Sequence, residues 1–302
     1  MVIILSYKIG SFNCLNFGRN SDKDLNIFIN IIMKENFDII ALQEIKGPQA
    51  LNRILSHLPS GKWDGIADTI SNDYAFIWNK NRICLAKSEE DTSRIYQPRI
   101  YRQYKVNRKE GQTKLIRDPY YARFFPIGPA APFMELRIIN CHIRFTKNDN
   151  LFENIGTAQM RRNELNVLTK AIYAKESDKR YGNNRPAYTI LLGDYNLNCK
   201  DSLATFPYLE EIIEIQDGNI IKKVITKQNQ LTTLKSQIQQ NENPLVNNYD
   251  HFSFDVDRFN GTKIDCERID AVELYCNNNY EKYKKSVSDH LPIKMELNLK
   301  ER

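Results

Sequence analysis

The segment Gly193-Asp194-Tyr195-Asn196 places a carboxylate and an amide directly after an apolar run. The preceding residues, Tyr188-Thr189-Ile190-Leu191, are aromatic, β-branched or aliphatic and predict a buried strand. Strand alternation then puts Asp194 and Asn196 on one side, and Gly193 allows a close approach of the backbone. Such a pair suits metal-assisted phosphoryl transfer, but Gly, Asp and Asn are also ordinary turn residues. This segment alone leaves both interpretations open.

Three further polar groups lie at the ends or in the middle of apolar segments. Glu44 closes the apolar run of residues 38–44, His142 lies in residues 133–143, and His290 follows Asp289 near the C-terminus. Glu44 is either a solvated strand end or a ligand group. His142 is either a satisfied core histidine or a catalyst, so none of these residues is decisive by itself.

Hydrophobic periodicity predicts the elements that must position these groups. Residues 74–79 and 82–87 are expected to form two strands joined by a tight turn at Lys80-Asn81. Residues 24–35 carry a one-sided apolar stripe that predicts a helix. Helices are also expected over 48–58, 157–177 and 206–213, and strands over 6–17, 38–44, 120–127, 133–143, 188–194, 249–254 and 293–299.

The length and composition indicate a protein whose hydrophobic core is large enough to fold without disulfide bonds or structural metals. The 302 residues contain no repeat, Pro/Gly linker or low-complexity boundary, so one domain over residues 1–302 is expected. The six cysteines form no CxxC pair, which favours free thiols in a reducing compartment. The N-terminal apolar run is too short for a signal sequence, and no segment is long enough for a membrane helix. We therefore expect a cytoplasmic, monomeric protein with no membrane partner.

Residues 94–117 are rich in basic and aromatic side chains. The net charge of +6 permits a polyanionic partner without requiring one. Basic residues interleaved with tyrosines suit a nucleic-acid backbone, although a solvated hairpin would have the same composition. The basic residues of this stretch are Arg94, Arg99, Arg102, Lys105, Arg108, Lys109, Lys114 and Arg117, against a single acid, Glu110.

The order of the polar motifs along the chain resembles the endonuclease/exonuclease/phosphatase superfamily. The resemblance extends over residues 6–299 and is most specific at Gly193-Asp194-Tyr195-Asn196 and at Ser288-Asp289-His290-Leu291-Pro292. The other motifs that carry it are Asn13, Leu42-Gln43-Glu44, Asn140-Cys141-His142 and Tyr249-Asp250. The implied fold is an α+β (α/β) four-layer sandwich, with two packed, mostly antiparallel β-sheets flanked by helices.

Within the superfamily, the chain is most similar to the deoxyribonuclease-I-like branch. The second histidine, His142, and the segment Arg117-Asp118-Pro119 suggest this branch, as does Lys46 shortly after Glu44. The branch implies that Arg117 and Lys46 contact DNA, and the basic stretch adds Arg99 and Arg102 as candidate substrate contacts. One departure is that Asp73 stands where the branch has a glutamate partner for the second histidine.

The resemblance also implies the catalytic roles. Glu44 would be the main ligand of Mg²⁺, or of Mn²⁺, with Asn13 beside it and Asp289 contributing; hard cations prefer such oxygen ligands. His290 would act as general base or contact the scissile phosphate, with Asp250 orienting its ring. Asp270 is the alternative partner, and Asp250 is preferred because it follows Tyr249 as in the nuclease branch. Asp194 and Asn196 would orient the attacking water and hold a phosphate oxygen. His142 would donate a hydrogen bond to the phosphate or to the leaving group.

Three functions follow from these residues. The first is a Mg²⁺-dependent, endonucleolytic nuclease that hydrolyses phosphodiester bonds in DNA. The second is a phosphoesterase for phospholipid or inositol phosphate headgroups, which would require a membrane-facing apolar loop that the sequence does not show. The third is a binding module without catalysis, which the intact set of catalytic residue types disfavours. DNA against RNA, and endonucleolytic against exonucleolytic action, stay open at this stage.

Overall fold

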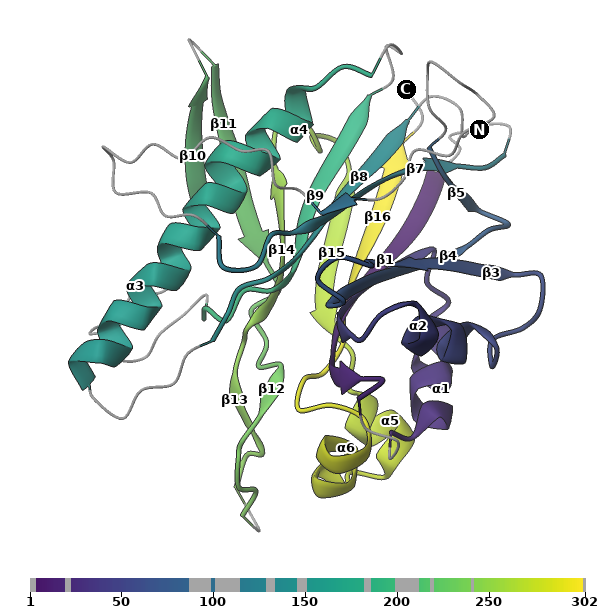
Figure 1. Cartoon of the computed structure of the whole chain (residues 1–302). Coiled ribbons are helices and arrows are strands. Elements are labelled where there is room, and N and C mark those ends of the chain that lie inside the picture. Colours follow the sequence, from purple (N-terminus) through teal and green to yellow (C-terminus); the bar gives the residue numbers. More distant parts are fainter. Residues whose placement is uncertain are drawn as a thin grey trace.

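Two β-sheets pack face to face, and helices cover both outer faces, in the computed structural model (Figure 1). The structure describes residues 4–19, 23–86, 99–100, 115–128, 134–145, 151–181, 186–198, 212–217, 220–239 and 242–300. This arrangement is the four-layer α+β sandwich expected from the sequence. Among the described residues, no helix is long and apolar enough to span a membrane.

The first sheet, sheet A, has six strands in the order β15-β16-β1-β2-β4-β3. Only the β1–β2 pair is parallel, and the other pairs are antiparallel. Its strands, in chain order, are β1 (Ile4–Phe17), β2 (Ile39–Ile45), β3 (Trp63–Ala67), β4 (Tyr74–Asn79), β15 (Lys263–Arg268) and β16 (Ile293–Lys300).

The second sheet, sheet B, has the order β10-β11-β14-β9-β8-β7-β5, and β6 pairs with β7. Its one parallel pair is β8–β9. A small hairpin of β12 (Thr233–Leu234) and β13 (Leu245–Asn247) lies outside both sheets. The strands of sheet B are β5 (Ile83–Leu85), β6 (Arg99–Ile100), β7 (Tyr120–Pro126), β8 (Glu135–His142), β9 (Ala187–Asp194), β10 (Ile212–Asp217), β11 (Ile220–Lys227) and β14 (Asp250–Asp255).

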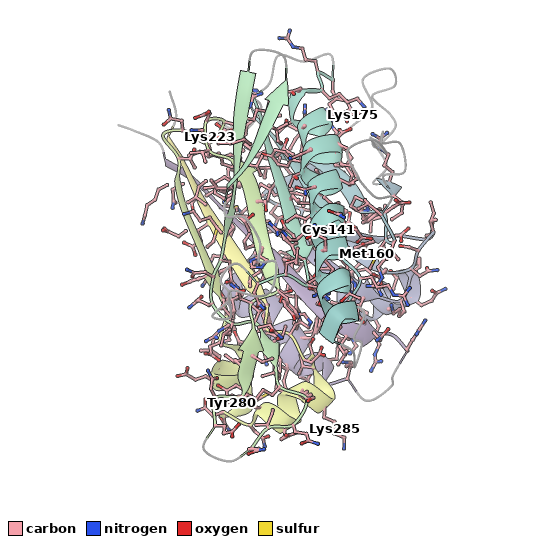
Figure 2. The ribbon with its side chains drawn as sticks, turned by 90° about the vertical axis from the view of Figure 1, so that its left-hand side faces the viewer. Cys141, Met160, Lys175, Lys223, Tyr280 and Lys285 are labelled. Carbon is pink, nitrogen blue, oxygen red and sulfur yellow. The ribbon has the colours of Figure 1, made fainter. Side chains whose placement is uncertain are left out.

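The helices form the two outer layers. Sheet A is covered by α1 (Leu25–Glu35), α2 (Pro48–Leu55), α5 (Ala271–Cys276) and α6 (Tyr280–Ser286), whose apolar side chains share one core with it. Sheet B is covered by a continuous helical segment made of α3 (Leu151–Val167), a π-helical turn η2 (Leu168–Tyr173) and α4 (Ala174–Asp178). Figure 2 shows this segment from the side, running from Met160 to Lys175, with α6 marked by Tyr280 and Lys285.

Local sequence explains where the first two helices begin. The Asp24 side chain accepts hydrogen bonds from the backbone N–H groups of Asn26 and Ile27, so it caps α1 as an N-terminal Asp is expected to do. Pro48 occupies the first turn of α2, where its missing N–H costs nothing. The expected helix at 24–35 is thus confirmed, and the expected helix at 157–177 is confirmed as part of the longer α3–η2–α4 segment.

Three apolar cores hold the layers together, and the central one lies between the sheets. Strand β4 shows why these strands have continuous apolar runs instead of alternation. Its Phe76 and Trp78 face the core between the sheets, whereas Ala75 and Ile77 face the helices of the outer layer. Both faces of such a strand are buried, as in other covered sheets.

The prediction of a hairpin with its turn at Lys80-Asn81 is wrong. Strand β4 belongs to sheet A, while β5 pairs with β7 of sheet B through Ile83–Pro126 and Leu85–Phe124. The tight turn therefore carries the chain from one sheet to the other, which local turn chemistry cannot distinguish from a hairpin. The helix expected at 206–213 lies mostly outside the described residues, and its last two positions, Ile212 and Ile213, instead begin strand β10.

Candidate active site

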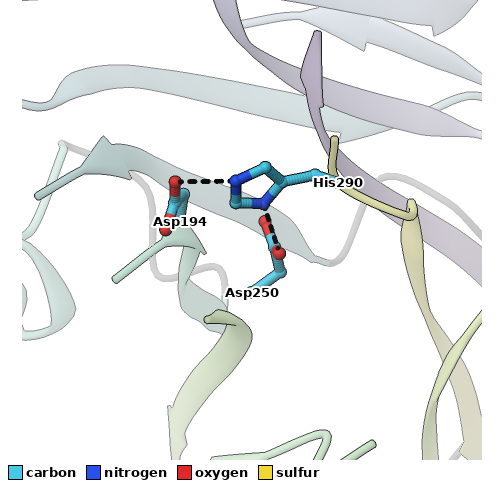
Figure 3. A group of neighbouring side chains, drawn as sticks. All are labelled: Asp194, Asp250 and His290. Atoms are coloured by element: carbon cyan, nitrogen blue, oxygen red, sulfur yellow. Dashed lines mark hydrogen bonds and ion pairs between the residues drawn. The ribbon is translucent and has the colours of Figure 1, made fainter. Parts of the chain in front are cut away.

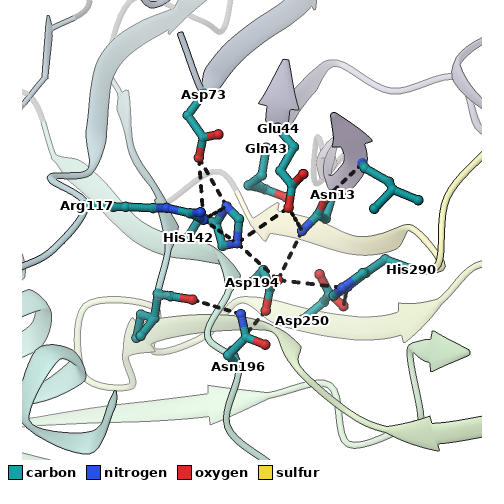
Figure 4. A network of polar contacts seen from close by, with 12 residues as sticks. Asn13, Gln43, Glu44, Asp73, Arg117, His142, Asp194, Asn196, Asp250 and His290 are labelled. Carbon is teal, nitrogen blue, oxygen red and sulfur yellow. Dashed lines mark hydrogen bonds and ion pairs between the residues drawn. The ribbon is translucent and has the colours of Figure 1, made fainter. Parts of the chain in front are cut away.

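The polar motifs meet at one edge of the two sheets, where several strands begin or end (Figure 4). Strand pairing brings three of them together directly. Asp194, the last residue of β9, is paired in register with His142 of the parallel strand β8 and with Asp250 of the antiparallel strand β14. Glu44 lies at the end of β2 and His290 just before β16. These five residues therefore form one cluster.

His290 is held between two aspartates (Figure 3). Its Nδ1 lies 2.8 Å from Oδ2 of the fully buried Asp250, and its Nε2 lies 3.7 Å from Oδ2 of Asp194. The backbone N–H of His290 donates to Ser288 Oγ, which in turn donates to the carbonyl of Asn13. These contacts fix the ring and leave Nε2 facing Asp194.

The alternative partner of His290 is engaged elsewhere. The Asp270 carboxylate accepts a hydrogen bond from Arg268 at 2.8 Å, at the start of α5. Of the two candidate aspartates, the structure places Asp250 against His290. Burial lowers the pKa of His290, but the charges of Asp250 and Asp194 outweigh it and raise that pKa well above its usual value.

His142 forms a second histidine–aspartate pair on the opposite side of Asp194. Its Nδ1 lies 3.1 Å from Oδ2 of Asp73, and its Nε2 lies 3.7 Å from Oδ2 of Asp194. Asp73 is shorter than the glutamate of the deoxyribonuclease-I-like branch, but it reaches the ring. Burial raises the pKa of Asp73, yet His142, Lys46 and Arg117 together hold it well below its usual range.

Lys46 and Arg117 lie at this second pair. Lys46 Nζ is 2.9 Å from Oδ1 of Asp73, and the Arg117 guanidinium contacts both ring nitrogens of His142. Arg99 is not brought to the cluster, because it forms an ion pair with the buried Glu176 and lies over the ring of Tyr121. Arg102 and most of the basic stretch 94–117 lie outside the described residues.

Glu44 is held in an unusual backbone conformation beside Asn13. Its φ of 60° lies in the left-handed region, which costs a non-glycine residue of order 1 kcal/mol and persists where surrounding contacts fix it. Oε2 accepts from the backbone N–H of Asn16 at 2.9 Å, and Oε1 lies 3.4 Å from Asn13 Nδ2. The same Asn13 Nδ2 donates to Asp194 Oδ2 at 3.1 Å, so Asn13 links the two carboxylates.

Oxygen atoms suited to a divalent cation lie at Glu44, Asn13 and Asp289. Oδ1 of Asp289 is buried and has no hydrogen-bond partner among the described residues, so a bound cation would satisfy an acceptor that is otherwise unpaired. A second group, Asp194, Asp250 and His290, also has ligand atoms within 4.8 Å of one another. There, however, Asp250 already occupies Nδ1 of His290, and Mg²⁺ prefers oxygen to the remaining nitrogen. The first group offers oxygen ligands alone, although Asn13 Oδ1 also accepts from the backbone N–H of Leu15 at 3.0 Å.

Asn196 and Gly193 have positioning roles in the described geometry. The backbone N–H of Asn196 donates to Asp194 Oδ1, and its Nδ2 donates to the carbonyl of Ile143 at 2.8 Å. Gly193 has φ of +136°, and a Cβ there would lie 1.9 Å from the carbonyl oxygen of Cys141. The close approach that glycine permits is therefore between strands β8 and β9.

A buried amide pair, which sequence reasoning did not identify as functional, joins the two sheets beneath the cluster. Gln43 Nε2 of sheet A donates to Asn140 Oδ1 of sheet B at 2.7 Å, and Asn140 Nδ2 donates to the carbonyl of Leu42 at 3.0 Å. Both side chains are fully buried. The only sequence signal was their place beside Glu44 and His142 in the Leu-Gln-Glu and Asn-Cys-His motifs.

Three solved structures with the same fold were compared with the chain. TDP2 of D. rerio complexed with single strand DNA product has a TM-score of 0.56 and 15% identity, covering 97% of this chain and 99% of its own. ANGEL2, a 2',3'-cyclic phosphatase, in complex with adenosine-2',3'-vanadate, has a TM-score of 0.55 and 13% identity, and the match covers 98% of this chain and 96% of the ANGEL2 chain. A functionally unknown conserved protein from Enterococcus faecalis V583 has a TM-score of 0.51 and 13% identity, and the match covers 97% of this chain and 100% of that protein's chain. These identities establish the fold alone.

No curated protein matches the sequence. The model of the Endonuclease/Exonuclease/phosphatase family matches residues 10–290. This range includes Asn13, Glu44, His142, Asp194, Asp250 and His290. The chain therefore belongs to the endonuclease/exonuclease/phosphatase family of metal-dependent phosphoester hydrolases.

Proposed function

We propose that this protein is a Mg²⁺-dependent nuclease that hydrolyses phosphodiester bonds in DNA, endonucleolytically, as a one-domain, cytoplasmic monomer. The observation that carries the proposal is the convergence of two histidine–aspartate pairs. Nε2 of His142 and Nε2 of His290 each lie 3.7 Å from the same Oδ2 of Asp194. Two imidazoles on one carboxylate suit a phosphodiester, which has two ester oxygens and two non-bridging oxygens that share one negative charge.

His290 is assigned to the scissile phosphate and Asp194 to the attacking water. With its pKa raised by Asp250 and Asp194, His290 is suited to donate from Nε2 to a phosphate oxygen. The Asp194 carboxylate then lies between the two histidines, where it can orient a water and accept its proton. Asn196 supports this carboxylate through its backbone N–H.

His142 is assigned to the leaving-group side. Asp73 accepts from Nδ1 and fixes the ring, so that Nε2 is directed at the same space as His290. Arg117 adds positive charge there. A divalent cation held by Glu44, Asn13 and Asp289 would neutralise charge that develops on the phosphate.

Two observations favour nucleic acid as the substrate. Lys46 and Arg117 place cationic groups next to His142, where a DNA backbone would pass, with side chains 18% and 35% exposed. The structurally similar TDP2 of D. rerio was solved with a single-stranded DNA product. We therefore assign DNA to this site ahead of lipid or inositol phosphate headgroups.

The test is a side-by-side comparison of substrates at equal Mg²⁺ concentration. Purified protein is given DNA oligonucleotides, phosphatidylinositol phosphates and sphingomyelin, and each product is quantified. We expect DNA cleavage to have the largest kcat/KM by far. Phosphate release from a phosphoinositide, or phosphocholine release from sphingomyelin, without DNA cleavage would replace the nuclease assignment with the headgroup phosphoesterase.

A further inference from the structure

An aromatic pair, of which Phe145 is exposed and Tyr249 is partly buried, lies next to the segments that carry the two histidine–aspartate pairs. Phe145 follows His142 by three residues, and Tyr249 directly precedes Asp250. The two rings are 6.2 Å apart between centroids, with an interplanar angle of 36°. The Phe145 residue is 45% exposed, so its ring is accessible to a ligand at this edge of the sheets.

The backbones that carry both rings are fixed by the catalytic segment itself. The N–H of Ile143 donates to the carbonyl of Asp194, and the side chain of Asn196 donates to the carbonyl of Ile143. On the other side, the N–H of Tyr195 donates to the carbonyl of Tyr249 at 2.8 Å. The rings are therefore held at a set position relative to Asp194.

Arg161 of α3 lies over the ring of Phe145. Its Cζ lies 4.8 Å from the centroid of Phe145, within the range of a cation–π contact. Arg161 is only 9% exposed, yet Nε and Nη1 have no hydrogen-bond partner among the described residues. Burial lowers the pKa of Arg161, and the charges of Tyr249 and Asp194 only partly offset that effect. A buried guanidinium with unpaired N–H groups is suited to an anion.

We propose that Phe145 and Tyr249 form a stacking platform for an unpaired nucleobase next to the scissile phosphate, and that Arg161 faces the adjoining phosphate. The ligand class is single-stranded nucleic acid, including frayed or gapped DNA. Aromatic side chains bind bases of any sequence through their π-faces, whereas a base inside a duplex is already stacked and is not available. The inference rests on the proposed nuclease function and specifies its substrate.

Binding is tested without cleavage, in chelator, with a single-stranded oligonucleotide that carries 2-aminopurine. We expect wild-type protein to quench the fluorescence and Phe145→Ala to bind about 5- to 150-fold more weakly, from the ~1–3 kcal/mol of one stacked base and 1.36 kcal/mol per tenfold. Phe145→Trp should restore both signals, which a merely disturbed fold would not. Leu274→Ala, 57% exposed on α5, is the matched control and should equal wild type.

Cleavage then separates this inference from the proposed function. An oligonucleotide with an abasic nucleotide beside the scissile phosphate should be cut at the same reduced rate by wild type and Phe145→Ala. Equal binding of 2-aminopurine DNA by wild type and Phe145→Ala would overturn the platform while leaving the nuclease assignment intact. Phe145-dependent quenching without cleavage of any DNA would support the platform and refute the nuclease assignment.

Discussion

Replacing Asp250 with asparagine tests the histidine–aspartate pair at the centre of the site. The carboxylate and the imidazole are both buried, and Oδ2 lies 2.8 Å from Nδ1 of His290. Two unit charges at that separation attract by about 6 kcal/mol at an effective dielectric constant of about 20, and by about 1.5 kcal/mol at about 80. An asparagine amide also offers N–H donors to Nδ1, which favours the wrong tautomer of the ring.

These energies predict a fall in kcat of between about tenfold and about 10⁴-fold for Asp250→Asn, because each 1.36 kcal/mol corresponds to tenfold. The measurement is cleavage of a labelled oligonucleotide at saturating Mg²⁺, with KM determined separately. KM should change little, since the substitution affects the histidine and not the exposed cationic groups.

Asp270→Asn is the matched control for this substitution. Asp270 is paired with Arg268 at the start of α5, so its loss should leave kcat within a few fold of wild type. Thermal unfolding of both variants shows whether either has lost its fold. Asp250→Asn with wild-type kcat, or Asp270→Asn with the larger loss, would refute the assignment of Asp250 to His290.

Three other predictions concern the cation, the second histidine and stability. Glu44→Gln should weaken Mn²⁺ binding at least tenfold in a titration followed by electron paramagnetic resonance, because it removes the charged oxygen ligand. His142→Ala and Asp73→Asn should each lower kcat, and the double variant should lose no more than His142→Ala alone, because Asp73 acts through that ring. Glu135→Gln should lower the free energy of unfolding at pH 7 by about 3–5 kcal/mol, because Arg123 would lose its buried carboxylate.

The stability effect of Glu135 should depend on pH. Burial raises its pKa, but hydrogen bonds and charge from Arg123 and Arg137 lower it below the usual value. The stabilisation is therefore present above the unfolded-state pKa of about 4.3 and is lost as the pH falls through the lower folded-state pKa. Urea unfolding of wild type and Glu135→Gln from pH 7 to pH 3 should show the two curves converging, and a constant gap would contradict this.

Each remaining substitution has its own control. Glu242→Gln, an exposed residue paired with Lys235, should not alter Mn²⁺ binding. If Glu44→Gln binds Mn²⁺ as wild type does, the cation lies elsewhere, and the group around Asp194 becomes the candidate. Additive losses in the His142 and Asp73 cycle would mean that Asp73 acts independently of the ring, for instance through Lys46.

Much of the site could be predicted from the sequence because each catalytic group lies at the end of an apolar strand. Asp194 ends β9 of sheet B and Glu44 lies at the end of β2 of sheet A, so each is placed by its own strand, and the packing of the two sheets brings them together. Spacing alone leaves both Asp250 and Asp270 as partners of His290, and only the resemblance, through Tyr249-Asp250, favours Asp250. Only strand β14, paired with β9, places Asp250 at the ring.

Other features depend on contacts between segments far apart in the chain. The crossing from β4 to β5 has the local sequence of a hairpin, and only the pairing of β5 with β7 reveals that it joins two sheets. The amide bridge between Gln43 and Asn140 likewise requires the sheets to be packed before it exists. Such features have no local periodicity from which they could be predicted.

The central claim, metal-dependent hydrolysis of DNA at the His290 site, is tested most directly with circular DNA. Wild-type protein is incubated with Mg²⁺ and either supercoiled plasmid or circular single-stranded DNA, beside one sample with excess chelator and one with His290→Ala. We expect wild type to cut circular DNA and neither control to do so. Plasmid and single-stranded circles that both stay intact with wild-type protein and Mg²⁺, or cleavage that persists in His290→Ala, would contradict the proposed function.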